Sequence, residues 1–284
     1  MKPKIRLFDE MFSESGVAIG GHQPPSFFDW HKGDEACDIA VFTGHHLDKA
    51  DQYDCKTKIA LLIESPAMYP APYGDIMSRH KDFDVVLTHI NDLADELPNG
   101  KLYHLGGCWI EPPVMYHKDH DVSMIFSWKR HSAGQKLRHE VYEHRELFRK
   151  KIDFFGRGHK TIKEIDNKLE GLQRYRYSVA IENLDKDFYF TEKLIDCFST
   201  GTVPIYWGCP GIEKIFDPNG MILFSNIEEL KFIVNQMVGE YDYDNRTNAI
   251  VRNYDRAKRH VIVEDWLWNN VFSLYALAEE AKKA

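Results

Sequence analysis

Along most of the chain, short continuous runs of hydrophobic residues alternate with longer segments in which hydrophobic residues recur every three to four positions. Short runs rich in β-branched and other apolar residues are typical of buried strands. Longer segments with an apolar residue every three to four positions are typical of amphipathic helices. In the first part of the chain, the short runs predict strands over residues 5–8, 39–43, 59–63, 85–88 and 102–105.

The second part of the chain repeats this alternation more regularly. The pattern predicts strands over residues 122–128, 152–155, 177–181, 203–207 and 221–224. It predicts helices over residues 135–150, 162–172, 191–200, 227–238 and 246–260. The apolar stripe of the first of these helices consists of Leu137, Val141, His144 and Phe148. Gly201 follows the third helix, where a left-handed residue commonly ends a helix.

Strict alternation of strand and helix predicts right-handed βαβ units, and therefore parallel sheets covered by helices on both faces. A polar, proline-containing stretch at 109–121 interrupts the pattern and is the predicted linker. The expected organisation is an N-terminal lobe (1–115), a C-terminal lobe (116–262) and a terminal segment (263–284). The terminal segment contains a predicted helix with a wide aromatic and apolar stripe that includes Leu267, Val271, Leu274 and Ala278. We expect this helix to cross back and pack on the N-terminal lobe.

The composition is that of an ordinary globular protein, with 284 residues of which 43% are hydrophobic and 13% aromatic. No apolar run approaches the roughly 20 residues of a membrane-spanning helix, and the N-terminus runs into a predicted strand without a signal peptide. These features predict a soluble, cytoplasmic protein with no transmembrane segment. The five cysteines form no C-x-x-C pair, and their odd number favours reduced thiols.

The net charge of −8 argues against a nucleic-acid partner. The charge is uneven, because residues 129–163 contain eleven Lys and Arg against four Asp and Glu and so carry a net +7. Two interpretations stay open at this point. The segment is either a solvated helix face or a local anion site large enough for a diphosphate.

Polar residues follow the predicted strands of the C-terminal lobe, at the edge where open α/β sheets bind their ligands. Glu182 and Asn183 directly follow one strand, and the next helix begins with Thr191, Glu192 and Lys193. Thr191 and Glu192 suit a helix start, since a hydroxyl caps the helix and a carboxylate meets its positive end. Lys193 has the wrong sign for that position, which indicates either a solvent-exposed ammonium or a bound anion at the helix N-terminus.

Three further positions are candidates for the same chemistry. Arg138 lies in the helix after the first strand of this lobe and is either a surface arginine or a two-pronged phosphate ligand. Gly156 and Arg157 follow the next strand, in a turn that either approaches a nucleotide or only connects two elements. In the N-terminal lobe, Glu64 ends an apolar run, where a carboxylate either serves as a general base or caps the next segment.

The sequence offers no constellation for a bound metal or for several other common chemistries. The histidine pairs lack the spacing and the neighbouring carboxylates of zinc or D-x-D sites; these pairs are His45 and His46, His117 and His120, and His139 and His144. A dinucleotide-binding G-x-G-x-x-G after the first strand, a Walker loop and a G-x-S-x-G elbow are also missing from the sequence. We therefore expect no metal and no cofactor.

Three consecutive motifs closely resemble the signature of the α1,3/α1,4-fucosyltransferases, glycosyltransferase family ten. They read YSVAIEN at 177–183, YFTEKLID at 189–196 and GTVPIYWG at 201–208. The signature reads aromatic-E-N-S, then Y-[VI]-T-E-K, then G-T-[VI]-P-[VI]-Y-x-G. The resemblance extends over about residues 121–265, and more faintly over 59–66. This chain departs from the signature at Ile181, Leu184 and Phe190.

The resemblance implies a GT-B fold, in which two Rossmann-like lobes face a cleft and the C-terminal lobe binds a nucleotide sugar. It implies that Asn183 and Tyr189 contact GDP-fucose, that Glu192 meets the ribose hydroxyls and that Lys193 meets the diphosphate. It also places Arg138 on the phosphates. The remaining predicted nucleotide-sugar contacts are Glu182, Gly156 and Arg157.

The same resemblance assigns the base to Glu64, the glutamate of an E-S-P motif. Glu64 would take a proton from an acceptor hydroxyl, which attacks the anomeric carbon with inversion through an oxocarbenium-like transition state. Arg138 and Lys193 would stabilise the leaving diphosphate, so that no divalent metal is needed. The acceptor is expected to be an oligosaccharide or glycan, and the candidate stacking residues are Trp30, Tyr69 and Tyr73, for each of which core packing is the alternative.

Two alternatives to a fucosyltransferase stay open from the sequence. The first is a transferase of the same fold that uses another nucleotide sugar. The second is a non-catalytic module that binds a nucleotide or a carbohydrate. A nucleic-acid-binding protein that uses the basic segment fits poorly with the acidic remainder of the chain.

Overall fold

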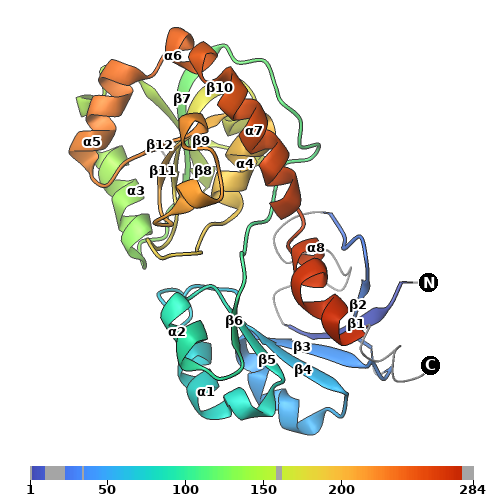
Figure 1. The fold of residues 1–284 in the computed structure, drawn as a ribbon. Helices are drawn as coiled ribbons and strands as arrows, with labels where there is room; N and C mark the ends of the chain where they lie inside the picture. The colour runs from blue at the N-terminus through green and yellow to red at the C-terminus, as the bar shows by residue number, and fades with distance from the viewer. Residues whose placement is uncertain (1, 10–22, 34, 158–161, 277–284) are drawn as a thin grey trace. The chain divides into compact units, whose positions relative to one another are not determined.

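The computed structural model describes residues 2–9, 23–33, 35–157 and 162–276. Contacts within the chain divide it into two compact units (Figure 1). Unit 1 comprises residues 1–107 with 262–284, and unit 2 comprises residues 108–261. The segment predicted as a linker belongs to unit 2, because the Trp109 amide donates to Asp196 and the Tyr116 amide donates to the Thr200 carbonyl.

Unit 1 is built on a parallel sheet of six strands, as the alternating pattern predicts. The strands in spatial order are β2 (Asp29–His31), β1 (Lys4–Phe8), β3 (Ile39–Thr43), β4 (Thr57–Leu61), β5 (Val85–Thr88) and β6 (Gly100–Leu102). The three-residue strand β2 is the one that the sequence analysis did not predict.

Successive residues of these strands point to opposite faces of the sheet and so build two separate cores. Ile39 and Val41 of β3 belong to one core, whereas Ala40 and Phe42 belong to the other. The second core is covered by α1 (Ala71–Arg79) and α2 (Asn91–Glu96).

The C-terminal helical segment covers the first core. It consists of α8 (Val263–Leu267) and a π-helical turn (Trp268–Phe272). Val263, Leu267, Val271 and Phe272 are buried among the apolar residues of β1, β3, β4 and β5. The prediction that this segment packs on the N-terminal sheet is confirmed. The prediction that Leu274 belongs to the buried stripe is wrong, because Leu274 is 60% exposed. The π turn at Trp268–Phe272 has more residues per turn than an α-helix, so it shifts which later residues face the sheet. Ala278 lies outside the described residues.

Unit 2 contains a second six-stranded parallel sheet. Its strands in spatial order are β12 (Ile222–Leu223), β11 (Val203–Trp207), β10 (Tyr175–Ile181), β7 (His120–Ser127), β8 (Ile152–Arg157) and β9 (Lys163–Glu164). When the strands are numbered one to six in chain order from β7, their spatial order from the β9 edge is 3-2-1-4-5-6, the order of Rossmann sheets. The direction of winding therefore reverses between β7 and β10, and this switch point is where such sheets bind ligands.

Helices flank the unit 2 sheet, with α3 and α5 on one side and α4 and α7 on the other (Figure 1). Their bounds are α3 Ala133–Glu143, α4 Glu192–Thr200, α5 Ile227–Phe232 continued by a π turn at Ile233–Met237, α6 Glu240–Asn245 and α7 Thr247–Ala257. The 3-10 segments of the two units are η1 Gly44–Gln52, η2 His80–Asp82, η3 Arg145–Leu147, η4 Lys168–Gly171, η5 Ile212–Lys214, η6 Pro218–Gly220 and η8 Lys258–His260.

Two predicted helices of unit 2 differ from the structure. Helix α3 ends at Glu143 instead of continuing to 150, since η3 turns the chain so that Phe148 enters the core while His144 stays exposed. The predicted helix 162–172 is wrong. Its first residues instead form β9, which pairs with the end of β8, and η4 follows.

Candidate functional site

The start of α3 and the end of β10 meet at the switch point of unit 2. Helix α3 begins with a capping box between Ser132 and Gln135, which satisfies amide groups of its first turn. The Gly134 amide donates to the Asn183 carbonyl at 3.2 Å. A Cβ atom at Gly134 would lie 1.7 Å from the Glu182 carbonyl oxygen, so glycine lets the helix approach the end of the strand.

Gly134→Ala tests this approach. Alanine normally stabilises a helix relative to glycine by up to about 1 kcal/mol, but overpacking typically costs about 1–3 kcal/mol. A main-chain carbonyl within 2 Å is a severe case, so we expect a net loss in the free energy of unfolding, measured in urea. Gly74→Ala in α1 is the matched control, because its Cβ meets no atom within 4 Å and should be neutral or stabilising. A Gly134→Ala protein as stable as Gly74→Ala would contradict the close approach.

Arg138 projects from α3 toward the end of β10. Its Nε donates to the Ile181 carbonyl at 2.9 Å, and one terminal nitrogen donates to the same carbonyl and to Asn183 Oδ1, the latter at 3.0 Å. The side chain is buried, which lowers the pKa of the guanidinium despite the nearby carboxylates Glu182 and Glu192. The surface-arginine alternative is therefore wrong, and Arg138 is a buried cation at the switch point.

Glu182 is fully buried and bonded within the protein. Its two carboxylate oxygens accept from the Thr191 amide at 2.8 Å and the Thr191 hydroxyl at 2.7 Å. A Cβ at Gly208 would lie 2.6 Å from Glu182 Cγ, so the second glycine of GTVPIYWG leaves space for this side chain. These contacts show that the Glu182 carboxylate anchors the start of α4, and they favour a structural role; its contact with the nucleotide sugar stays a prediction.

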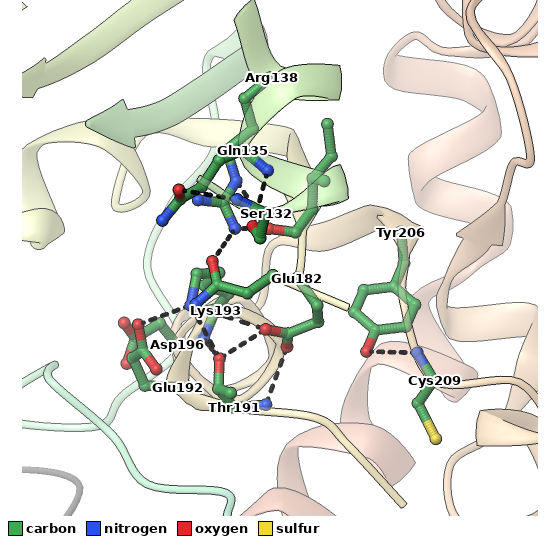
Figure 2. A network of polar contacts seen from close by, with 12 residues as sticks. Ser132, Gln135, Arg138, Glu182, Thr191, Glu192, Lys193, Asp196, Tyr206 and Cys209 are labelled. Carbon is green, nitrogen blue, oxygen red and sulfur yellow. Dashed lines mark hydrogen bonds and ion pairs between the residues drawn. The ribbon is translucent and has the colours of Figure 1, made fainter. Parts of the chain in front are cut away.

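Lys193 lies in the first turn of α4 and is bound by several oxygens (Figure 2). Its Nζ lies 3.0 Å from Thr191 Oγ1, 3.2 Å from Glu192 Oε1 and 3.6 Å from Glu182 Oε2. The side chain is 25% exposed, so it is neither a fully solvated lysine nor a buried one. Thr191 caps α4 as predicted, and Gly201 ends the helix in the left-handed region with φ 74°.

Lys168, which the sequence analysis did not identify, completes this network. Its Nζ lies 3.0 Å from Glu192 Oε1 and 3.2 Å from Asp196 Oδ2. Burial alone would raise the pKa of Glu192, but Lys168 and Lys193 outweigh it and hold that pKa well below its ordinary value. For Asp196, burial dominates and raises the pKa. Two ammonium groups thus converge on one ionised glutamate.

Asn183 and Tyr189 are close in sequence to residues of this network, since Asn183 follows Glu182 and Tyr189 lies two positions before Thr191. Tyr189 is only 2% exposed, so the side chain packs inside unit 2 rather than at its surface. The residue before it, Phe188, has φ 64°, an uncommon value for a side chain of this size. Asn183 is half-buried and joins α3 to β10 through both its side chain and its carbonyl.

Where the described cations of the basic segment 129–163 form ion pairs, their partners are carboxylates outside this site. Arg130, for example, pairs with Glu143 at 2.7 Å, and Lys151 pairs with Asp153 at 3.3 Å. Arg138 contacts Asn183 at the switch point, whereas Arg157, the other predicted anion-binding side chain of the segment, bonds to the carbonyls of Ile165 and Asp166. The solvated-surface interpretation of the segment is therefore favoured.

Gly156 and Arg157 belong to β8 itself and do not form a turn after it. A Cβ at Gly156 would lie 1.8 Å from the Phe126 carbonyl oxygen, so the glycine is needed where β8 meets β7. The Arg157 guanidinium donates to the carbonyls of Ile165 and Asp166. These contacts favour the structural interpretation of both residues.

Glu64 lies in unit 1, three residues beyond the end of β4, and is half-buried. Its carbonyl accepts from the Tyr73 hydroxyl at 2.7 Å, and that hydroxyl lies 3.4 Å from His89 Nε2. Burial raises the pKa of Tyr73 and lowers the pKa of His89 to about 4. Tyr73 therefore holds the backbone at Glu64, which favours the core-packing alternative to stacking on the acceptor.

The other two candidate stacking residues also lie in unit 1. The Trp30 indole donates to Glu264 at 3.2 Å and packs edge-on against Phe28 and Phe272, which favours the core-packing alternative. Tyr69 is half-buried, with His45 packed edge-on against its ring at 4.6 Å. Tyr69 thus keeps part of its surface accessible.

Within the described ranges, no group of three or more His, Cys, Asp or Glu side chains has the geometry of a metal site. All five cysteines are free thiols, as predicted. No helix among the described residues is long and apolar enough to cross a membrane.

The segment that contains this site is similar to a known family of enzymes. Residues 115–248 match the family model described as glycosyltransferase family 10 (fucosyltransferase), C-terminal. A putative fucosyltransferase-like protein of Arabidopsis thaliana is 26% identical over 246 residues, covering 84% of this chain and 45% of the relative. The alpha-(1,3)-fucosyltransferase FucT of Helicobacter pylori is 39% identical over 67 residues, covering 24% of this chain and 13% of the relative. The chain thus spans less than half the length of these curated relatives.

Two solved structures share the fold. An alpha1,3-fucosyltransferase crystallised with GDP has a TM-score of 0.53 at 15% identity, covering 93% of each chain. The Anabaena HepE protein in complex with UDP-glucose has a TM-score of 0.56 at 9% identity, covering 85% of this chain and 78% of that one. The two parallel-sheet units and these neighbours define an α/β protein of the GT-B class. The match of residues 115–248 to the model of glycosyltransferase family 10 confirms the resemblance seen in the motifs.

Proposed function

We propose that the chain is an inverting, metal-independent fucosyltransferase that moves L-fucose from GDP-fucose to a hydroxyl of a glycan acceptor. The match to the fucosyltransferase family model and the similarity to FucT support glycosyl transfer and favour fucose. The alpha1,3-fucosyltransferase neighbour was solved with GDP, which supports a guanine nucleotide as the leaving group. The predicted cytoplasmic location is part of this proposal.

The observation that carries the proposal is the buried charge of Arg138. Its hydrogen bonds go to a main-chain carbonyl and an amide oxygen, and Glu182 and Glu192 act on it from nearby without forming a salt bridge among the described residues. A buried cation without an ion-pair partner is costly, and a bound anion would compensate it. Lys193 and the N-terminus of α4 lie in the same network, so a diphosphate at the switch point would meet positive groups from two helices.

In the proposed reaction, Glu64 accepts the proton of the acceptor hydroxyl as the acceptor oxygen forms a bond to the anomeric carbon. The bond between that carbon and the β-phosphate oxygen breaks at the same time, and GDP departs with the bonding electrons. The configuration inverts because attack and departure occur on opposite faces of the sugar. Arg138 and Lys193 stabilise the charge that develops on the leaving diphosphate.

A thermal-shift panel of GDP, UDP, CMP and NAD tests the donor. We expect selective stabilisation by GDP, reaching about 2.7 kcal/mol at a concentration 100-fold above Kd. The shift should be the same with EDTA as with Mg²⁺, because fixed cations replace the metal. Preference for UDP would indicate a transferase that uses another nucleotide sugar. The HepE neighbour, which shares the fold, was solved with UDP-glucose. Stabilisation by GDP without turnover of GDP-fucose in the presence of any glycan would indicate a non-catalytic module.

A further inference from the structure

Lys168 and Lys193 share one acceptor atom. Both ammonium groups donate to Glu192 Oε1, at 3.0 Å and 3.2 Å (Figure 2 shows the surrounding network). The two lysines come from different elements, since Lys168 is the first residue of η4 and Lys193 lies in α4. One carboxylate oxygen therefore has two counter-charges that are held independently of each other.

Lys168 is fixed by contacts other than its bond to Glu192. Asp196 accepts from it at 3.2 Å, and the second oxygen of Asp196 accepts from the Trp109 amide at 2.7 Å. The ammonium also lies 5.8 Å from the centroid of the Trp109 ring. Asp196 is 2% exposed at its side chain, so this anchor is inside the protein. Lys168 would keep its position if Lys193 moved.

In the proposed donor complex, the roles that the family resemblance implies for Lys193 and Glu192 would draw the two side chains apart. Lys193 would turn to the diphosphate, whereas Glu192 would accept the ribose hydroxyls. The Glu192 side chain is only 20% exposed, and a largely buried carboxylate that loses its only counter-charge is strongly disfavoured. A second ammonium on the same oxygen removes this difficulty.

We propose that Lys168 is a positioning residue that keeps Glu192 ionised and oriented toward the ribose when Lys193 binds the donor diphosphate. This inference rests on the proposed function. It assigns to Lys168 no contact with the donor itself.

The charges around Glu192 give the proposal a pH signature. Lys168, Lys193 and Arg138 face it as cations, and Asp196 and Glu182 face it as carboxylates. Burial raises the pKa of Glu192, and the two lysines together lower it well below the ordinary value. Without Lys168 the pKa rises, and it rises further when Lys193 turns to the diphosphate. Since the ionised form accepts the ribose hydroxyls, GDP affinity of such a variant should fall as the pH falls.

Calorimetric titration with GDP and with inorganic pyrophosphate tests the proposal, from neutral pH down to about pH 5. For Lys168→Met we expect GDP affinity to fall about tenfold at neutral pH and further at lower pH. Pyrophosphate lacks the ribose, so its affinity should change less than about twofold. Lys168→Arg should restore GDP binding. Lys231→Met, which removes an exposed lysine paired with Glu228 at 3.2 Å on α5, is the matched control.

Lys168→Gln keeps a donor but removes the charge, and it replaces the Met variant if that protein does not fold. Unchanged GDP affinity and pH dependence in both charge-removing variants would overturn the proposal. An equal loss for GDP and pyrophosphate would also overturn it, since Lys168 would then be a phosphate ligand. Failure of the unmodified protein to bind GDP at any pH would instead refute the proposed function itself.

Discussion

Lys193→Ala is expected to lower kcat for fucose transfer by about 100- to 1,000-fold, which corresponds to about 2.7–4 kcal/mol. The physical reason is the loss of one preorganised cation at the point where the leaving diphosphate gains charge. The variant should still fold, because Glu192 keeps Lys168 and Glu182 keeps its two bonds from Thr191. The measurement is GDP release from GDP-fucose at saturating donor, with the best acceptor of a glycan panel.

The matched control for Lys193 is Lys231→Ala, which removes an exposed lysine of α5. Its kcat should equal that of the unmodified protein. Near-normal turnover of Lys193→Ala at saturating donor would show that Lys193 does not stabilise the transition state.

Glu64→Gln is expected to abolish most of the transfer, with a loss of about 100- to 10,000-fold in kcat, the usual contribution of a general base. Glutamine keeps the size of the side chain and cannot accept the acceptor proton. GDP affinity should be unchanged, because the proposed nucleotide contacts lie in unit 2. Initial rates and GDP titration on the same preparation measure both effects.

Glu96→Gln, at the exposed end of α2, is the control for the Glu64 substitution. A parallel loss of GDP affinity and kcat in Glu64→Gln would argue that Glu64 acts in binding or folding. Full activity of the variant would exclude it as the base.

The parallel sheets and most strand positions were predictable because buried parallel strands are near-continuous apolar runs. Strands β3, β5 and β11 have the predicted bounds. Helix α4 was equally predictable, since Thr191 and Gly201 supply its capping residues in local sequence. Local signals of this kind need no knowledge of the rest of the fold.

The failures arise where distant residues decide the structure. The apolar pattern of 162–172 suits a helix, yet pairing with the end of β8 takes its first residues into the sheet. Lys168 lies in this misassigned segment, so its approach to Glu192 across 24 positions of sequence could not be foreseen. Had residues 163–164 been predicted as a parallel strand, η4 would have been expected beyond the carboxyl end of that strand. Lys168 would then have been a candidate for the site.

The site residues for which the structure favours a structural role follow the same principle. A carboxylate at the end of a strand, such as Glu182, suits a ligand site by position alone. Its actual role depends on Thr191 and Gly208, which tertiary structure brings against it. Tyr73 likewise has an aromatic ring typical of sugar sites, and its hydroxyl is instead bonded to the Glu64 carbonyl. Burial and bonding partners, which the sequence does not show, favour the structural role for these two residues.

A crystal structure of the protein soaked with GDP would locate the nucleotide directly. The account predicts the two phosphates beside the first turn of α4, with the Lys193 ammonium rotated onto them and the ribose hydroxyls on Glu192. Density for GDP elsewhere on the chain, or phosphates out of reach of Lys193 and Arg138, would contradict it.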